Sequence, residues 1–315
     1  MRFKLMAVAA SLVTSLVVAA CSPVGGTWVK LESGEPGAGG ATRTVRVGST
    51  NFGEQVVLAE AYAQILEANG YAVERKLSLG SREIVQPALE SSQIDLYPEY
   101  LATMLAFVSK GEQKGSTDAA ETHRLLEETL KPRGIAVLDF APGVNTSGFV
   151  TTRATADKLK LTRVSDLAPI GNQLVLGGPP ECLQRPFCLV GLRATYGITF
   201  MDFRPLDVGG PLTTASLEGG QIDVAVVYTT DAKIAARGWV LLEDDKKLQL
   251  ADNVAPVVRE DLLAKAPADF RMLLNSLAPK LTTATLTEMN RKADVDRQDP
   301  KRVAGDWLKE NGLVK

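Results

Sequence analysis

Short β-rich runs alternate with helical patterns along most of this 315-residue chain, and this alternation restricts the fold more than any other feature. Strands that alternate with helices favour parallel sheets with helices on their faces. The alternation begins near Thr44, with a strand at 45–47 and a helix at 54–69. We therefore expect an α/β protein. Further strands are predicted at 72–78, 94–97, 135–138, 174–177, 222–228 and 239–242, a further helix at 82–91, and three closing helices at 259–277, 281–292 and 300–311.

One segment of the chain occurs twice. Residues 89–95 read Leu-Glu-Ser-Ser-Gln-Ile-Asp, residues 217–223 read Leu-Glu-Gly-Gly-Gln-Ile-Asp, and each copy is followed five residues later by a tyrosine, Tyr100 or Tyr228. Both copies indicate a helix end, a tight turn and a strand. Ligands of open parallel sheets bind beyond the carboxyl ends of strands, so two equivalent lobes would present these tyrosines to a shared cleft. The alternative is that both tyrosines simply pack within ordinary α/β units.

Composition excludes several classes of function. The formal charge is -2, from 35 Lys and Arg against 37 Asp and Glu, so we expect no nucleic-acid partner. One histidine, His123, leaves no multi-histidine metal site, and we expect it at the surface. The chain has no Walker A motif and no Gly-x-Ser-x-Gly elbow. Asp95 and Glu99 are expected to orient a strand end rather than form an acid–base pair. We expect no enzyme, no cofactor and no metal.

The N-terminus has the pattern of an export signal. Arg2 and Lys4 precede an apolar run that ends in Val18-Ala19-Ala20-Cys21, which resembles the bacterial lipoprotein signal. We expect residues 1–21 to be a lipoprotein signal peptide ending at lipidated Cys21; the alternative is an ordinary secretory signal with an incidental cysteine. Residues 22–43 are rich in Gly and Pro and are expected to form a flexible tether. The protein would then be extracytoplasmic and anchored to a membrane by lipid.

Two cysteines remain in the body of the chain, Cys182 and Cys188. Export places them in an oxidising compartment, where closely spaced cysteines form disulfides. We expect a small disulfide-closed loop.

An ordered set of motifs in the body carries a family resemblance. The motifs are residues 47–55, residues 79–85 and Asp95-Leu96-Tyr97-Pro98-Glu99-Tyr100, followed by 256–259, 280–283 and 307–309. Together they resemble the osmoprotectant-binding family of ABC importers, whose members bind glycine betaine, choline, carnitine and related quaternary amines. The resemblance covers residues 44 to 313. It implies a two-lobed type II periplasmic-binding fold, with parallel-rich sheets flanked by helices and an interlobe ligand cleft. Lobe one would comprise 44–143 and 250–315, and lobe two 144–249.

The resemblance also implies a binding site. A quaternary ammonium group donates no hydrogen bond, so its binding requires aromatic faces, whereas a betaine carboxylate suits arginine. Matched by motif, Tyr100, Thr103, Arg185 and Tyr228 are the expected core of the site.

Three positions depart from the family pattern. Thr50 stands where a lysine is frequent, Ser147 where a tyrosine is expected, with Phe149 two residues on, and Asp252 where another tyrosine is expected. Fewer aromatic faces and an added carboxylate predict weak binding of quaternary amines, or a preference for a more cationic ligand such as choline.

The predicted function is that of a monomeric binding lipoprotein that delivers a quaternary amine to an ABC permease with separate ATPase subunits. The alternative is the same fold redirected to another small solute, such as an amino acid or an aromatic compound.

Overall fold

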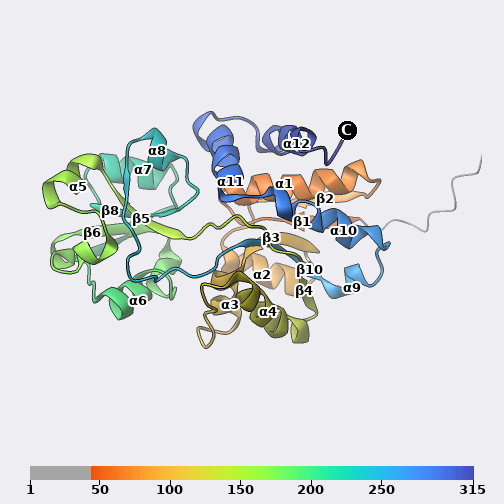
Figure 1. The fold of residues 1–315 in the computed structure, drawn as a ribbon, viewed down its shortest axis with the longest axis horizontal. Helices are drawn as coiled ribbons and strands as arrows, with labels where there is room; N and C mark the ends of the chain where they lie inside the picture. Colours follow the sequence, from red (N-terminus) through yellow and green to blue (C-terminus); the bar gives the residue numbers. More distant parts are fainter. Residues whose placement is uncertain (1–43) are drawn as a thin grey trace, which may run out of the picture. The chain divides into compact units, whose positions relative to one another are not determined.

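The computed structural model describes residues 44–315, so the predicted signal peptide, Cys21 and the tether lie outside the described residues. Two five-stranded sheets organise this part of the chain (Figure 1). The first sheet has the order β2 (Val73–Lys76), β1 (Val45–Gly48), β3 (Leu96–Tyr100), β10 (Val254–Arg259) and β4 (Ile135–Val137). The second has the order β7 (Asp202–Pro205), β6 (Val175–Gly178), β8 (Val224–Tyr228), β5 (Ser147–Thr151) and β9 (Val240–Leu241). We call each sheet with its helices a lobe.

Each sheet contains four parallel strands and one reversed strand. The reversed strands are β10 and β5, which pair antiparallel with both of their neighbours. Each begins directly after the chain crosses from the other lobe, through residues 138–146 before β5 and 242–253 before β10. The sheets are therefore parallel-rich, as predicted, with one exception in each. The reversal of β5 and β10 follows from the chain topology. Each of these strands enters its sheet from the other lobe, at the edge where the parallel strands end, and therefore runs in the opposite direction.

The repeated segment has the same structure in both lobes. Its strands, β3 and β8, occupy the centre of their sheets. The N–H of Asp95 donates to the carbonyl of Arg46 and its carboxylate accepts from the Arg46 N–H, while Asp223 makes the same two bonds with Val175. Each aspartate therefore fixes the start of a central strand, which is the orienting role expected for Asp95.

Helices cover both faces of each sheet. The predicted helix 259–277 is divided, because Pro267 has no N–H to continue it. The first lobe contains α1 (Gly53–Ala68), α2 (Arg82–Glu90), α3 (Leu101–Val108), α4 (Ala119–Leu130), α9 (Glu260–Leu263), α10 (Asp269–Asn275), α11 (Thr283–Asn290) and α12 (Pro300–Glu310). The second contains α5 (Arg153–Leu159), α6 (Leu189–Gly191), α7 (Pro211–Glu218) and α8 (Lys233–Ala236).

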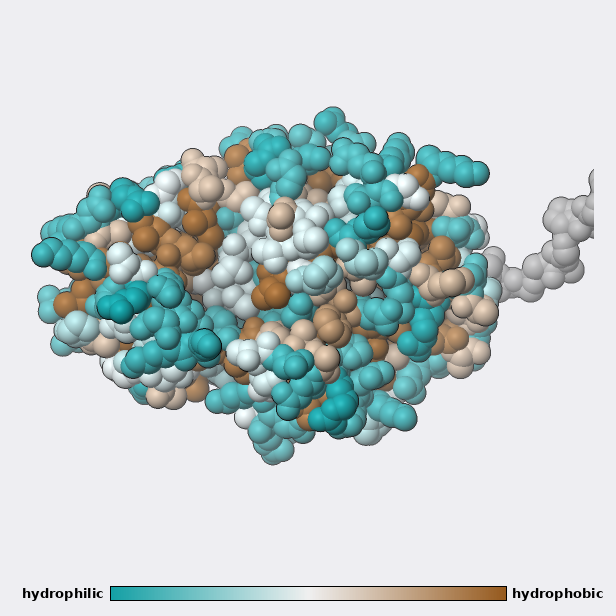
Figure 2. Space-filling model, in the orientation of Figure 1, coloured by the Kyte–Doolittle hydropathy of each residue, from teal (hydrophilic) through white to brown (hydrophobic). Residues whose placement is uncertain are grey.

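The face of the molecule shown in Figure 2 is mainly hydrophilic. On the face shown in Figure 2, hydrophobic residues emerge only in separate patches among polar and charged ones. Within residues 44–315, none of the helices has the length and apolar character that crossing a membrane requires.

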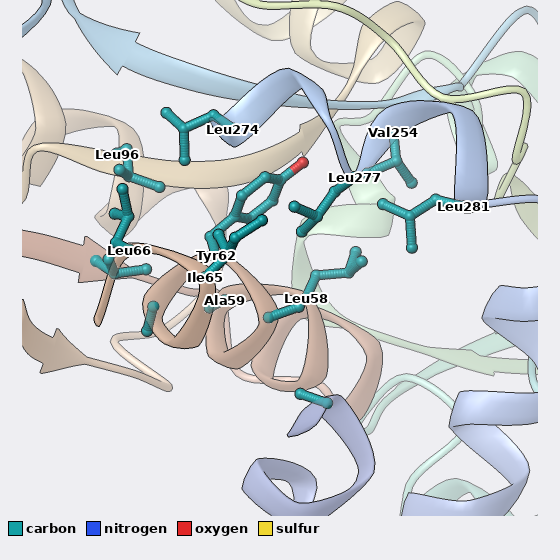
Figure 3. Packing of buried hydrophobic residues seen from close by; sticks show 14 of the residues in the cluster. Leu58, Ala59, Tyr62, Ile65, Leu66, Leu96, Val254, Leu274, Leu277 and Leu281 are labelled. Carbon is teal, nitrogen blue, oxygen red and sulfur yellow. The ribbon is translucent and has the colours of Figure 1, made fainter. Parts of the chain in front are cut away.

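Packing in the first lobe determines which face of the sheet the side chain of Tyr100 occupies. Along β3, Leu96 and Tyr100 join the cluster around α1, whereas Tyr97 joins the cluster under α3 and α4. This division follows the two-residue period of a strand. Figure 3 shows Tyr62 of α1 in this cluster, between the sheet and the leucines of the C-terminal helical region.

Candidate functional site

A cavity of about 1090 Å³ lies between the two lobes. Much of its wall comes from segments that follow the parallel strands and from the start of the two reversed strands. These positions all lie at the carboxyl edge of a parallel sheet, where ligands of α/β folds bind. The segments are 50–55, 99–103, 179–181, 206–211 and 228–231 after parallel strands, with Asn145, Ser147 and Asp252 at the reversed ones.

Most of the residues predicted for the site line this cavity. Phe149 does not, because it lies two residues further along β5 than Ser147 and is buried in the hydrophobic core of the second lobe. Phe149 was predicted to contact the ligand, but in the structure it belongs to the buried hydrophobic cluster of the second lobe. The predicted residues that do line the cavity are Thr50, Tyr100, Thr103, Ser147, Arg185, Tyr228 and Asp252.

Phe52 joins the two predicted tyrosines in one aromatic row. Its ring centroid lies 4.5 Å from that of Tyr228 and 6.2 Å from that of Tyr100. Phe52 is the extended residue that precedes α1, and it lines the cavity. Sequence reasoning missed it, although it lies within the first family motif, because the aromatic rings were sought at the tyrosine positions of the family pattern and at Phe149.

Glu54 is a buried carboxylate at the base of this row, with 2% of its surface exposed. One oxygen accepts from the Tyr100 hydroxyl at 2.6 Å and from Asn145 at 2.8 Å. The other accepts from Thr230 at 2.6 Å and from Asn290 at 2.7 Å. Glu54 has no Lys or Arg partner among the described residues, and it lies in the first turn of α1, where the helix dipole favours an anion. This single carboxylate therefore bonds both lobes.

A second buried network holds Thr103 and Asp252. Arg82 donates to Glu99 at 2.6 and 2.7 Å and to the Thr103 hydroxyl at 2.8 Å. The Thr103 N–H and hydroxyl donate to Asp252 at 2.9 and 3.2 Å. Burial opposes the charge of Arg82, but the adjacent Glu99 outweighs burial and raises the pKa of Arg82. Glu99 also accepts from the Tyr100 N–H, so it orients the strand end and takes no part in an acid–base pair with Asp95.

Burial raises the pKa of Asp252 to about 7, although the Thr103 N–H and Arg82 act in the opposite direction. The folded protein therefore keeps this proton above pH 4, where the unfolded chain releases it, and the associated stability is lost as the pH rises through about 7. We expect the stability of the wild-type protein relative to Asp252→Asn to fall between pH 4 and pH 7 and to level off above it. Urea unfolding across this range measures the difference; a difference that does not change with pH would contradict a protonated Asp252.

Arg185 projects from the loop closed by the Cys182–Cys188 disulfide and already has an anionic partner. Its guanidinium lies 3.0 and 3.1 Å from the two carboxylate oxygens of Glu83, at the start of α2 in the opposite lobe. A second ion pair between lobes joins Lys233 to Asp294 at 3.6 Å. The chain could therefore close its lobes through side chains of its own.

Comparison with known proteins places this site in a family context. Residues 43–310 match the family model described as the substrate binding domain of ABC-type glycine betaine transport system. The glycine-betaine-binding protein of Pseudomonas aeruginosa is 31% identical over 282 residues, covering 86% of this chain and 89% of the relative. The glycine betaine-binding protein YehZ of Escherichia coli is 28% identical over 284 residues, covering 87% and 93%.

A solved structure agrees with these matches. It is described as a glycine betaine/carnitine/choline ABC transporter, and it superposes with a TM-score of 0.67 at 26% identity over 85% of this chain and 99% of its own. The likeness confirms the predicted two-lobed α/β binding-protein fold.

Proposed function

This chain belongs to the family of substrate-binding domains of ABC-type glycine betaine transport systems, and we propose that it binds a small quaternary amine in the cavity between its lobes. Membership of a family of binding proteins confirms the prediction that the chain is not an enzyme.

The aromatic row of Phe52, Tyr100 and Tyr228 carries this proposal. Each cation–π contact with a desolvated quaternary ammonium contributes roughly 0.5–2 kcal/mol. Phe52 supplies a third ring and offsets the aromatic faces missing at Ser147 and Asp252. The buried carboxylate of Glu54, which accepts from the Tyr100 hydroxyl and also lines the cavity, lies next to this row.

Arg185 is the cavity residue we assign to a ligand carboxylate, with Thr50, Thr103, Ser147 and Asp252 as further polar contacts. The hydroxyl of Thr50 is buried and has no hydrogen-bond partner within residues 44–315, so it is available to a bound ligand. The names of the relatives and of the solved structure make glycine betaine, carnitine and choline the first ligands to examine.

Thermal unfolding of the purified protein with a ligand panel tests the proposal. A ligand present at 100 times its Kd stabilises the folded state by about 2.7 kcal/mol, so binding gives a clear rise in Tm. We expect a rise with at least one of choline, glycine betaine and carnitine. No rise with any of them at high millimolar concentration would refute the proposal, and a rise with an amino acid or aromatic compound instead would establish the redirected alternative.

We also propose that the protein works outside the cytoplasm as a lipid-anchored monomer that delivers its ligand to a permease. The lipoprotein-like sequence ending at Cys21 and the family assignment support this. The strands of the two sheets support lobe boundaries at 44–143 with 250–315 and at 144–249. Mass spectrometry of the mature N-terminus would detect the lipid, and Cys21→Ser should release the protein from membranes.

A further inference from the structure

Among the cations that line the cavity, Arg185 is the one available to a ligand at the aromatic row. Arg185 and Tyr228 line one small pocket together with Ser147, so the guanidinium lies next to the row. The charge of Arg185 also opposes the rise that burial causes in the pKa of Tyr228. Arg82 is buried against Glu99, and Lys233 is paired with Asp231 at 2.9 Å. The remaining cations of the lining, Lys110, Arg237 and Arg297, are exposed.

Glu83 forms an ion pair with Arg185 of the kind that a ligand carboxylate would form. Its two oxygens both accept from the same guanidinium nitrogen, and both side chains line the cavity. Burial acts to raise the pKa of Glu83, but the charge of Arg185 and hydrogen bonds from Ser81 and Arg185 lower it overall, so Glu83 is ionised at neutral pH. The side chains of Arg185 and Glu83 are 27% and 36% exposed, so solvent reaches the pair and an incoming carboxylate can exchange with Glu83.

We propose that Glu83 determines which quaternary amines the site accepts, by competing with a ligand carboxylate for Arg185. This inference rests on the proposed function. A zwitterion such as glycine betaine must displace Glu83 before its carboxylate can pair with Arg185. The binding free energy from the new ion pair is therefore largely cancelled by the loss of the Glu83–Arg185 pair. Choline has no carboxylate and binds without disturbing the pair. The site therefore favours cations over zwitterions of similar size.

Isothermal titration of choline and glycine betaine into the wild type and Glu83→Gln tests the inference. The glutamine keeps the size of the side chain but gives up its charge. We expect glycine betaine to bind roughly three- to tenfold more tightly to the variant, in the range of a partly exposed ion pair, while choline affinity stays constant or falls. The selectivity ratio of the two ligands is thus the diagnostic quantity. Thermal unfolding without ligand checks that the variant is folded.

Two further variants distinguish competition between Glu83 and a ligand carboxylate from a general weakening of the contacts between the lobes. Asp294→Asn removes the other ion pair between lobes without touching Arg185, and it should change the affinities for both ligands by the same factor. In an Arg185→Gln background, Glu83→Gln should no longer alter selectivity. If Glu83→Gln changes both affinities equally, or alters selectivity without Arg185, the inference is wrong while the proposed function stands. If neither choline nor glycine betaine binds any of these proteins, the inference is wrong, and the proposed function fails as well if carnitine also gives no rise in Tm.

Discussion

Replacing Glu54 with alanine should lower the free energy of unfolding by roughly 3–5 kcal/mol, because several buried donors lose their acceptor and the structure relaxes only in part. The substitution deletes the acceptor of four donors, and buried donors left unsatisfied each cost about 1–3 kcal/mol before the structure relaxes. Tyr100, Asn145, Thr230 and Asn290 supply these donors, and all four residues are at least 94% buried. Water cannot easily replace the carboxylate.

A second glutamate of the same helix provides the control. Glu67 lies near the end of α1 and pairs with Arg75 at 2.6 Å, but its side chain is 39% exposed. Exposed ion pairs contribute about 0–1 kcal/mol, so Glu67→Ala should be nearly neutral. Urea unfolding monitored by circular dichroism compares the two. Equal effects of the two substitutions would show that the Glu54 network does not stabilise the fold.

Replacing Tyr228 with alanine should weaken the binding of choline by roughly ten- to thirtyfold, as expected for the loss of a strong cation–π contact of up to about 2 kcal/mol. Tyr228→Phe keeps the ring face and should retain most of the affinity. Tyr228 is preferable to Tyr100 for this test, because the Tyr100 hydroxyl also bonds Glu54 and its removal affects stability.

The neutral compound 3,3-dimethylbutan-1-ol distinguishes a cation–π contact from ordinary packing, since it replaces the ammonium nitrogen of choline with carbon. Tyr228→Ala should reduce the preference for choline over this compound, measured by titration calorimetry. Tyr71→Ala is the matched control, because Tyr71 packs on Phe270 in the first lobe and is absent from the cavity lining. A loss of the same size for both compounds would show that Tyr228 provides only shape.

Sequence reasoning located the ends of several strands, including those near Tyr100 and Tyr228, but not the contacts between them. The repeat ending at Tyr100 and Tyr228 could be interpreted because Asp95 and Asp223 act locally within each sheet. β5, β7 and β10 were not among the predicted strands. The reversed direction of β5 and β10 was not predicted either, since hydrophobic periodicity carries no information about strand direction. Phe149 was predicted as a ligand contact because a sequence motif does not show how far a residue lies from the cavity end of its strand.

Phe52 and Glu54 were missed for a different reason. Their partners come from segments far apart in the chain, and Glu54 alone joins α1 to residues 145, 230 and 290. A glutamate in the first turn of a helix is an ordinary helix-start signal, so nothing in its local sequence marks it as a contact between lobes.

The two crossing segments are bonded to each other, and this limits how the lobes can move. The Asn145 N–H donates to the Asp252 carbonyl at 3.2 Å, and the Val254 N–H donates to the Gly143 carbonyl at 3.2 Å. Paired connections resist twisting, so bending remains as the main freedom between the lobes. Asn145 and Asp252 also line the cavity. The same residues therefore belong both to the connections between the lobes and to the wall of the cavity, so any change in the angle between the lobes also changes the shape of the cavity.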